Sequence, residues 1–151
     1  MEYLILPIER FGELEVLYDM SGFREKRYEN LKKCREICIV AEEDGRLCGE
    51  VNIMIRNSNI PAAVVPNRRV YLFGLHVVPE HRHKGVATAL VSNAVRLAAQ
   101  RGIFEVTIGV EKGNTAARRL YEKLGFTSFL DDCVEYPNGK ECRFDLLMLR
   151  L

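Results

Sequence analysis

The stretch Val77-Val78-Pro79-Glu80-His81-Arg82-His83-Lys84-Gly85-Val86-Ala87-Thr88 joins a strand-like apolar run to a helical pattern through a basic, glycine-containing turn. The first N–H groups of a helix have no partners within it and lie at the positive end of its dipole, so they attract anions. Gly85 lets a ligand approach the backbone closely, and the cationic side chains of the turn add to the attraction. The sequence therefore predicts that an anionic group, such as a phosphate, binds in this stretch.

Length and composition restrict the class of protein. The 151 residues fit one domain of ordinary size, so we expect a single domain over residues 1–151. The net charge of +1 argues against nucleic acid or a membrane surface as a partner. No apolar run is long enough to cross a bilayer, and residues 1–7 lack the features of a secretion signal. The five cysteines form no Cys-x-x-Cys pair, which favours reduced thiols and a cytoplasmic protein.

The spacing of apolar residues predicts a mixture of strands and helices. β-Rich runs predict strands at 3–8, 37–41, 47–55, 70–78, 104–110, 133–136 and 142–149. Helical spacing predicts helices at 11–20, 23–34, 86–100 and from the candidate N-cap Asn114 to the closing Gly125. Asp44-Gly45 and residues 137–140 predict hairpin turns, and residues 57–67 predict a loop. We therefore expect an α+β fold with a mixed sheet that is parallel in the middle.

The basic turn matches neither common phosphate-binding signature, because it contains no Gly-x-x-x-x-Gly-Lys-Ser/Thr and no Gly-x-Gly-x-x-Gly. Its remaining pattern, Arg82-x-x-Gly85-x-Ala87, is weak by itself, because basic loops at solvated helix starts are common. A second segment adds specificity. Residues 114–126 read Asn-Thr-Ala-Ala-Arg-Arg-Leu-Tyr-Glu-Lys-Leu-Gly-Phe and open a helix directly after the next strand.

These two segments, in this order and at this spacing, resemble the motifs of the GNAT superfamily of acetyl-CoA-dependent N-acetyltransferases. The first family motif is a strand, a Val-x-Pro turn, Gln/Arg-x-x-Gly-x-Gly/Ala and a helix, and residues 77–87 match it. The second, Asn-x-x-Ala-x-x-Leu-Tyr-x-x-x-Gly-Phe, matches residues 114–126. The resemblance implies a GNAT-like fold, with a mixed, mostly antiparallel sheet that contains two splayed parallel strands and is flanked by helices.

The resemblance also implies how acetyl-CoA binds. The pyrophosphate would lie on the N–H groups of residues 83–88, and the pantetheine arm would pair with the strand end at residues 75–77. Asn114 would contact the pantetheine arm, although a role as a helix cap alone also fits. The residues implied in binding acetyl-CoA are Leu75, His76, Val77, Arg82, His83, Lys84, Gly85, Val86, Ala87, Thr88, Asn114 and Tyr121.

In the family, an amine attacks the acetyl carbon directly, and a backbone N–H near Leu75 or His76 would stabilise the oxyanion. Tyr121 stands at the position of the acid that protonates the departing thiolate. A phenol with a pKa of about 10 suits that role. The spacing of Tyr121 on its helix also fits a packing role, so both interpretations stay open.

The motifs do not identify the base that accepts the proton of the amine. Many family members carry a glutamate in the central strand, whereas the corresponding face here has Tyr71, Phe73 and Leu75. Three candidates stand near the predicted site, namely His76, Glu111 and Glu50. His76 lies beside the oxyanion position, but strand alternation turns it to the opposite face from Leu75 unless a bulge shifts the register. Glu111 ends the next strand, and a charge at Glu50 on a buried strand face would be unusual.

We therefore expect a GNAT-type N-acetyltransferase that uses acetyl-CoA and a primary amine, either a small molecule or a peptide. A non-catalytic acyl-CoA-binding or regulatory domain is the alternative, which the missing strand glutamate favours. Homodimerisation through the terminal strands is a further expectation from the family. His81 and His83 flank Arg82 in a turn without matching Cys or carboxylate ligands, so we expect no metal site.

Overall fold

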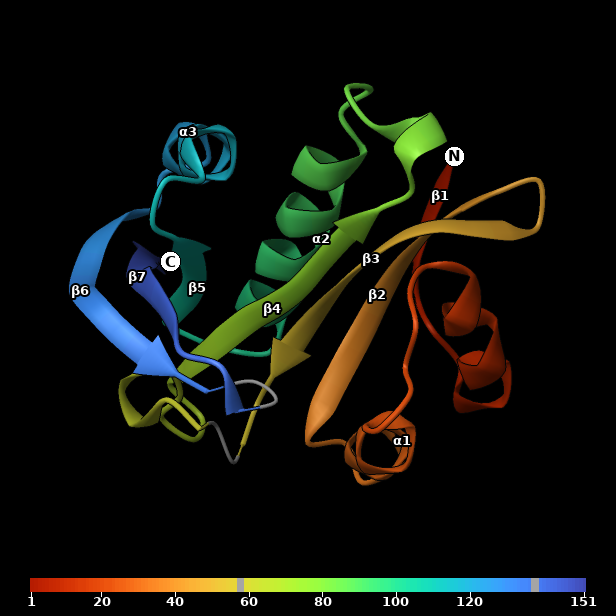
Figure 1. The fold of residues 1–151 in the computed structure, drawn as a ribbon, viewed down its shortest axis with the longest axis horizontal. Helices are drawn as coiled ribbons and strands as arrows, with labels where there is room; N and C mark the ends of the chain where they lie inside the picture. The colour runs from red at the N-terminus through yellow and green to blue at the C-terminus, as the bar shows by residue number, and fades with distance from the viewer. Residues whose placement is uncertain (57–58, 137–138) are drawn as a thin grey trace.

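A computed structural model describes residues 1–56, 59–136 and 139–151 of the protein (Figure 1). Within these residues the strands form one seven-stranded sheet in the order β1-β2-β3-β4-β5-β7-β6. The strands are β1 (Glu2–Ile5), β2 (Glu36–Glu43), β3 (Arg46–Met54), β4 (Arg69–Val77), β5 (Glu105–Glu111), β6 (Thr127–Glu135) and β7 (Cys142–Arg150). Only the β4–β5 pair among them is parallel. The predicted mixed, mostly antiparallel sheet is therefore confirmed.

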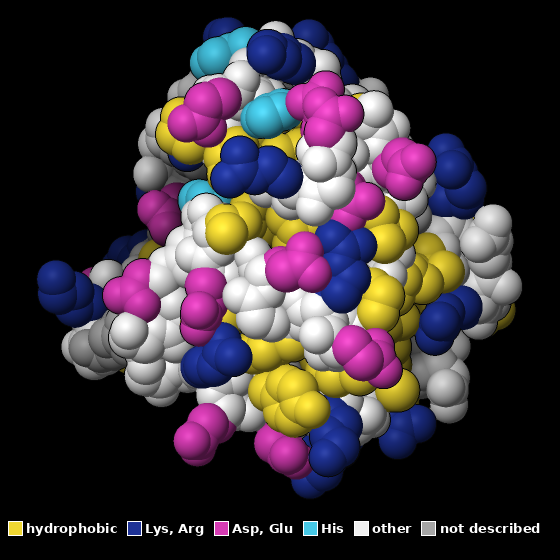
Figure 2. Space-filling view, turned by 90° about the vertical axis from the view of Figure 1, so that its right-hand side faces the viewer, with side chains coloured by type: hydrophobic (Ala, Val, Ile, Leu, Met, Phe, Trp, Pro, Cys, Tyr) yellow, Lys and Arg dark blue, Asp and Glu magenta, His cyan; other side chains and the backbone are white. Residues whose placement is uncertain are grey.

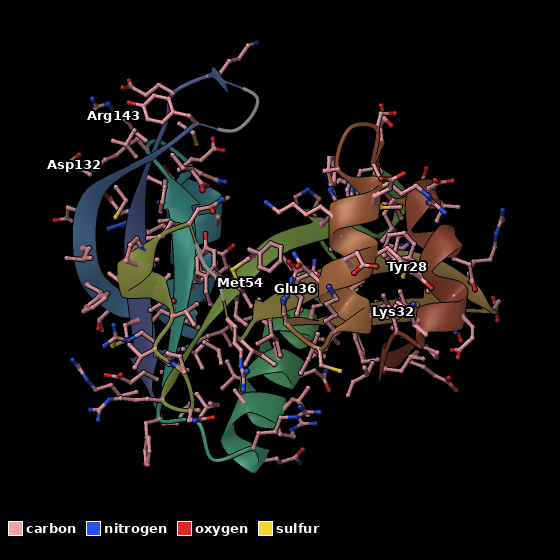
Figure 3. All side chains as sticks on the ribbon, turned by 90° about the horizontal axis from the view of Figure 1, so that it is seen from below. Tyr28, Lys32, Glu36, Met54, Asp132 and Arg143 are labelled. Atoms are coloured by element: carbon pink, nitrogen blue, oxygen red, sulfur yellow. The ribbon has the colours of Figure 1, made fainter. Side chains whose placement is uncertain are left out.

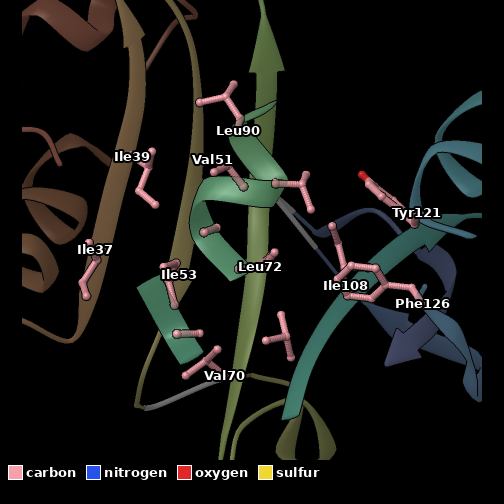
Figure 4. Packing of buried hydrophobic residues seen from close by; sticks show 14 of the residues in the cluster. Ile37, Ile39, Val51, Ile53, Val70, Leu72, Leu90, Ile108, Tyr121 and Phe126 are labelled. Atoms are coloured by element: carbon pink, nitrogen blue, oxygen red, sulfur yellow. The ribbon is translucent and has the colours of Figure 1, made fainter. Parts of the chain in front are cut away.

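The helices cover both faces of this sheet. They are α1 (Arg24–Lys32), α2 (Val86–Gln100) and α3 (Thr115–Lys123), with 3-10 helices η1 (Ile8–Val16), η2 (Pro61–Ala63) and η3 (Pro79–His81). Helix α2 buries the predicted apolar stripe, which includes Leu90, against Val51 and Leu72 of the central strands (Figure 4). On the opposite face, η1 packs Phe11 and Leu14 against β2 and β3. None of the described helices has the length and apolar character that a bilayer crossing requires.

The predicted hairpin between β2 and β3 is confirmed. Asp44 and Gly45 both have positive φ angles, of 52° and 78°. This is the backbone that a two-residue turn of type I′ requires, and Asp-Gly adopts it readily. The hairpin brings β3 beside β4 and so builds the central part of the sheet.

Three predicted elements differ from the structure. The helix expected at 11–20 is the 3-10 helix η1, with Gly12 in its interior, which disfavours an α-helix. The first strand ends at Ile5, before Pro7, which has no N–H for the ladder. The strand expected at 133–136 begins six residues earlier, at Thr127. Its first half is largely exposed and is held by pairing with β7, so apolar alternation does not reveal it.

Two predicted segments lie partly outside the described residues. They are the loop at 57–67, of which residues 57–58 are not described, and the hairpin turn at 137–140, of which residues 137–138 are not described.

Candidate functional site

The basic turn forms the N-terminus of α2. Gly85 is the N-cap, and its φ of 81° lies in the left-handed region that favours glycine. A Cβ atom added at Gly85 would have no atom within 4 Å, so the space in front of this residue is open. The first turn of α2 contains no acidic residue. The Nε of Arg82 donates a hydrogen bond of 2.9 Å to the carbonyl oxygen of Val77, which ties the turn to the end of β4.

The side chains of this turn divide into exposed and buried ones. His83, Lys84 and Thr88 are exposed, whereas Val77 and Val86 pack into the core beneath α2. His81 forms a hydrogen bond of 2.6 Å with the carboxylate of Glu43. In the described part of the chain, no group of His, Cys, Asp and Glu side chains could hold a metal ion.

The parallel strands β4 and β5 separate halfway along their length. Their paired residues run from Arg69 with Glu105 to Leu72 with Ile108, and no registered pair follows among the described residues. The edge of β4 beyond Leu72 therefore has backbone groups that no strand partner occupies. A cavity of about 380 Å³ lies in the gap and is lined by residues of β4, β5, α3, β6 and β7. We call it the transfer cavity; its lining includes Phe73, Gly74, Leu75, Glu111, Asn114, Tyr121 and Glu135.

A bulge in β4 lies at the edge of this cavity. The register with β3 shifts between the pairs Asn52–Phe73 and Glu50–His76, and Gly74 has a φ of 63°. A Cβ atom at Gly74 would lie 2.9 Å from Nδ2 of Asn52. The close approach of the Asn52 side chain to the β4 backbone therefore also requires glycine at this position. The bulge turns His76 to the face of the sheet that Tyr71 and Phe73 occupy. His76 can act as a base only with such a shift in register, because regular alternation would turn its side chain away.

Tyr121 and Asn114 reach the transfer cavity from α3. Tyr121 is 5% exposed and lies above Ile108 and Phe126 (Figure 4). Burial raises the pKa of its hydroxyl to about 12, so the phenol stays protonated at neutral pH and can donate a proton. The side-chain oxygen of Asn114 accepts a hydrogen bond of 3.2 Å from the N–H of Ala117. Its predicted role as the N-cap is confirmed, and the same residue lines the cavity.

A second cavity, of about 530 Å³, lies on the α1 side of the sheet. We call it the acceptor cavity. Its lining combines aromatic side chains with a buried polar floor, and its residues are Tyr18, Phe23, Lys26, Arg27, Asn30, Glu36, Glu50, Asn52, Met54, Asn59, Phe73, Gly74, Leu75 and His76. Phe73, Gly74 and Leu75 line the transfer cavity as well. The two cavities therefore meet at the bulge of β4.

The three candidate bases lie in different surroundings. His76 faces the acceptor cavity, and its ring lies 5.8 Å from that of Tyr18. Glu111 is exposed at the end of β5 and lines the transfer cavity. Glu50 is 1% exposed, so the unusual case of a charge on a buried strand face is the one that the structure contains. Its two oxygens lie 3.3 Å and 2.9 Å from the guanidinium of Arg27, which neutralises the carboxylate and makes the burial of both groups tolerable.

The sequence did not indicate two features of these cavities. Glu135 lines the transfer cavity, and burial raises the pKa of its carboxyl group. Arg27 crosses from α1 to β3, where it also donates a hydrogen bond of 2.7 Å to Asn52. Glu135 ends an edge strand and Arg27 stands in a highly charged helix, so local patterns mark both as surface residues. Only the pairing of distant elements brings them to a cavity.

The comparison with family models agrees with this geometry. The model described as the acetyltransferase (GNAT) family matches residues 6–126, which is most of the chain. The chain belongs to the GNAT family. The predicted family is thereby confirmed, and the prediction of an acyltransferase that uses acetyl-CoA is confirmed at the level of that family.

Curated GNAT relatives include human and bacterial proteins. The chain is 31% identical to human N-acetyltransferase 8B over 120 residues, which are 80% of this chain and 50% of that protein. It is 30% identical over 133 residues to the uncharacterized N-acetyltransferase YhfO of Bacillus subtilis, with 85% of this chain and 84% of that protein covered. The chain thus spans about half the length of the human relative.

Solved GNAT structures share the fold. The acetyltransferase yncA from Salmonella typhimurium, solved with acetyl-CoA, superposes with a TM-score of 0.77 at 21% identity, covering 100% of this chain and 94% of that chain. The ribosomal-protein-alanine N-acetyltransferase from Brucella melitensis has a TM-score of 0.78 at 17% identity, with both chains fully covered. The GNAT fold predicted from the sequence is confirmed over the described residues.

Proposed function

We propose that this GNAT protein transfers the acetyl group of acetyl-CoA to a primary amine by direct attack. The observation that carries the proposal is the shared lining of the two cavities by Phe73, Gly74 and Leu75. A thioester in the transfer cavity and an amine in the acceptor cavity would meet at this bulge. Such an arrangement holds the reactants together, which is a large source of rate enhancement.

The residues of the donor side fit acetyl-CoA. The N–H groups of residues 83–88 would hold the pyrophosphate, with Arg82 and Lys84 supplying positive charge. The free edge of β4 beyond Leu72 would pair with the amide groups of the pantetheine arm. The thioester supplies an activated acetyl carbon. A backbone N–H near Leu75 would stabilise the oxyanion, and Gly74 sets the direction of that part of the strand.

We propose Tyr121 as the acid and His76 as the base. When the C–N bond forms and the C–S bond breaks, Tyr121 donates its proton to the departing thiolate, and His76 accepts the proton of the amine. His76 suits this role better than Glu50, whose oxygens are held by Arg27. Glu111 and Glu135 line the transfer cavity and not the acceptor cavity, so they lie on the side of the thioester rather than on the side of the amine.

An assay of thiol release from acetyl-CoA against a panel of primary amines tests the proposal. We expect turnover with at least one amine, and a fall in kcat of at least about tenfold in His76→Gln, because the amine then loses the group that accepts its proton. A Glu111→Gln variant should keep the wild-type kcat. Tight binding of CoA without acetyl transfer to any amine would instead indicate the non-catalytic acyl-CoA-binding domain.

We further propose a cytoplasmic protein that acts without nucleic acid. All five cysteines are free thiols, which suits a reducing compartment. On the face that Figure 2 shows, Lys and Arg side chains are interspersed with Asp and Glu side chains, unlike a nucleic-acid surface. Dimerisation through the terminal strands stays a prediction; the edge strand β6 exposes Leu130 and Val134 for it.

A further inference from the structure

Glu36 is a buried carboxylate at the far end of the acceptor cavity. It is 6% exposed and begins β2, beside Met54 of β3 and close to α1 (Figure 3). One oxygen, Oε2, accepts a hydrogen bond of 2.9 Å from Nδ2 of Asn30. The other oxygen, Oε1, is buried and has no hydrogen-bond donor among the described residues. Because buried polar atoms are nearly always hydrogen-bonded, this oxygen calls for a donor that the described residues do not supply.

The other charged groups of the acceptor cavity compensate the burial of Glu36 only in part. The Nη1 and Nη2 atoms of Arg27 bind Glu50 and Asn52 instead. Lys26 is exposed on α1, where water solvates its charge. Burial raises the pKa of Glu36, and the hydrogen bond from Asn30 and the charges of Arg27 and Lys26 oppose this rise. A cationic donor beside Oε1 would therefore stabilise the carboxylate strongly.

The strand pairing gives the distance between Glu36 and His76, the proposed base at the bulge of β4. Glu36 pairs with Met54, and Glu50 of the same strand β3 pairs with His76. Residues 50 and 54 are four positions apart, which corresponds to about 13 Å along a strand. The lining between these ends contains Phe73 and Asn52, and Tyr18 and Phe23 also line the cavity. These aromatic side chains offer apolar contacts to a connecting chain, beside the polar floor that Arg27, Glu50 and Asn52 form.

We propose that Glu36 binds a second cationic group of the acceptor, so that the substrate is a small amine with two positive charges joined by a largely apolar chain. This rests on the proposed acetyl transfer, in which one amine lies at the bulge of β4. The second ammonium or guanidinium group donates to Oε1 of Glu36. The interaction orients the acceptor and selects against amines that carry a neutral or negative group at that end.

Binding measurements with three matched probes test this inference. Octamethylenediamine carries two cations, octylamine carries one, and ω-aminooctanoate carries a carboxylate in place of the second cation. Calorimetric titration of each probe into the full-length protein with CoA present reports binding without turnover. We expect the diamine to bind roughly tenfold more tightly than octylamine, because a charge-assisted hydrogen bond to a buried carboxylate is lost in octylamine. The aminooctanoate should bind most weakly.

Glu36→Gln keeps the size of the side chain and removes its charge. We expect this variant to bind the diamine and octylamine equally, with its affinity for octylamine unchanged. Glu29→Gln is the matched control, because it makes the same chemical change at a glutamate in the C-terminal half of α1. Glu29 is exposed and pairs with Lys33. This variant should keep the wild-type preference. The octylamine affinity shows whether the cavity of Glu36→Gln is intact.

Equal binding of the diamine and octylamine to the wild-type protein would overturn the inference, and so would an unchanged preference in Glu36→Gln. In either case Oε1 is satisfied by water alone. A preference for the diamine that depends on Glu36, without thiol release from acetyl-CoA, would leave the cation site standing and would overturn the proposed acetyl transfer.

Discussion

The transfer cavity and the acceptor cavity share a stretch of β4 but are built in different ways. On the donor side, the basic turn and the start of α3 are two continuous segments, residues 77–88 and 114–126, and the transfer cavity beside them is also lined by β4, β5, β6 and β7. The acceptor cavity is lined by residues 73–76 of β4 and by scattered residues that follow η1, lie in α1, β2 and β3, or follow β3. The proposed contacts on the donor side are backbone N–H groups beside a glycine, whereas those on the acceptor side are buried charged side chains. A short sequence motif can therefore indicate the donor, which the whole family shares. The acceptor of this particular protein can be inferred only from the assembled fold.

The largest expected effect is on the acceptor side. Arg27→Met removes the cation but leaves Glu50 buried, so we expect the free energy of unfolding to fall by about 3 to 5 kcal/mol. Chemical denaturation measures the loss. Arg24→Met, on the same helix, removes a cation that is exposed and pairs with Glu15, and it should cost less than about 1 kcal/mol.

The difference in stability between these two variants shows whether the buried Arg27–Glu50 pair stabilises the fold around the acceptor cavity. Equal stabilities for Arg27→Met and Arg24→Met would show that the Arg27–Glu50 pair contributes nothing specific. At a temperature where Arg27→Met stays folded, its affinity for CoA should equal that of the wild type, because Arg27 binds Glu50 and Asn52 on the acceptor side.

The next effect is on the chemical step. Tyr121→Phe removes the proposed acid while keeping the packing of the ring, so we expect kcat to fall about a hundredfold, with little change in the KM for the amine. Steady-state kinetics with both substrates measures this. Tyr136→Phe changes an exposed tyrosine and should leave kcat unaltered. An unchanged kcat in Tyr121→Phe would show that Tyr121 only packs in the core and is not the acid.

The stability at alkaline pH gives a second test of Tyr121. The pKa of its hydroxyl is raised to about 12 in the folded protein, against about 10 in the unfolded chain. The unfolded chain loses this proton first, so stability falls as the pH rises from about 10 to 12, by about 2 to 3 kcal/mol at most from this group. Tyr121→Phe should show a smaller fall over the same range. An identical fall in both proteins would contradict the burial of this hydroxyl.

The smallest expected effect is on the binding of the donor. A valine at Gly85 would place a side chain in front of the α2 N-terminus, so we expect Gly85→Val to weaken CoA binding at least about tenfold, by loss of contact with the N–H groups. Gly102→Val is a matched control. Gly102 has a φ of 78° against 81° for Gly85, and a Cβ atom meets nothing within 4 Å at either position.

Both glycine variants carry the same backbone strain, so both should lose a similar amount of stability, about 1 to 2 kcal/mol. Only Gly85→Val should change the affinity for CoA, measured by calorimetric titration. Equal CoA affinities in the two variants would place the pyrophosphate elsewhere.

The sequence predicted the helices around the donor side well because their signals are local. The helix over 86–100 has the predicted bounds, since its apolar stripe and the two flanking glycines act on neighbouring residues. Asn114 caps α3 as expected, because capping involves only the next helical turn. The first half of β6 was missed because pairing with β7, rather than its own composition, makes it a strand.

The sequence could not decide the base or the acceptor. The face to which His76 points depends on the bulge at Gly74, and that bulge arises from pairing with β3. The sequence could not show that Glu50 is buried, because its partner Arg27 stands 23 positions away in the chain. Glu36 shows no motif, since its unpaired oxygen exists only once α1 covers β2.

The sequence by itself determined the family, the order of strands and helices, and the donor, because the family motifs stand in two short segments, residues 77–87 and 114–126. The tertiary structure alone decided which charges are buried, which way β4 turns its side chains and where the two cavities meet. The physical reason is the range of the forces. Caps, turns and periodicity act within a few residues, whereas burial, ion pairing and strand register depend on segments that meet only in the folded chain.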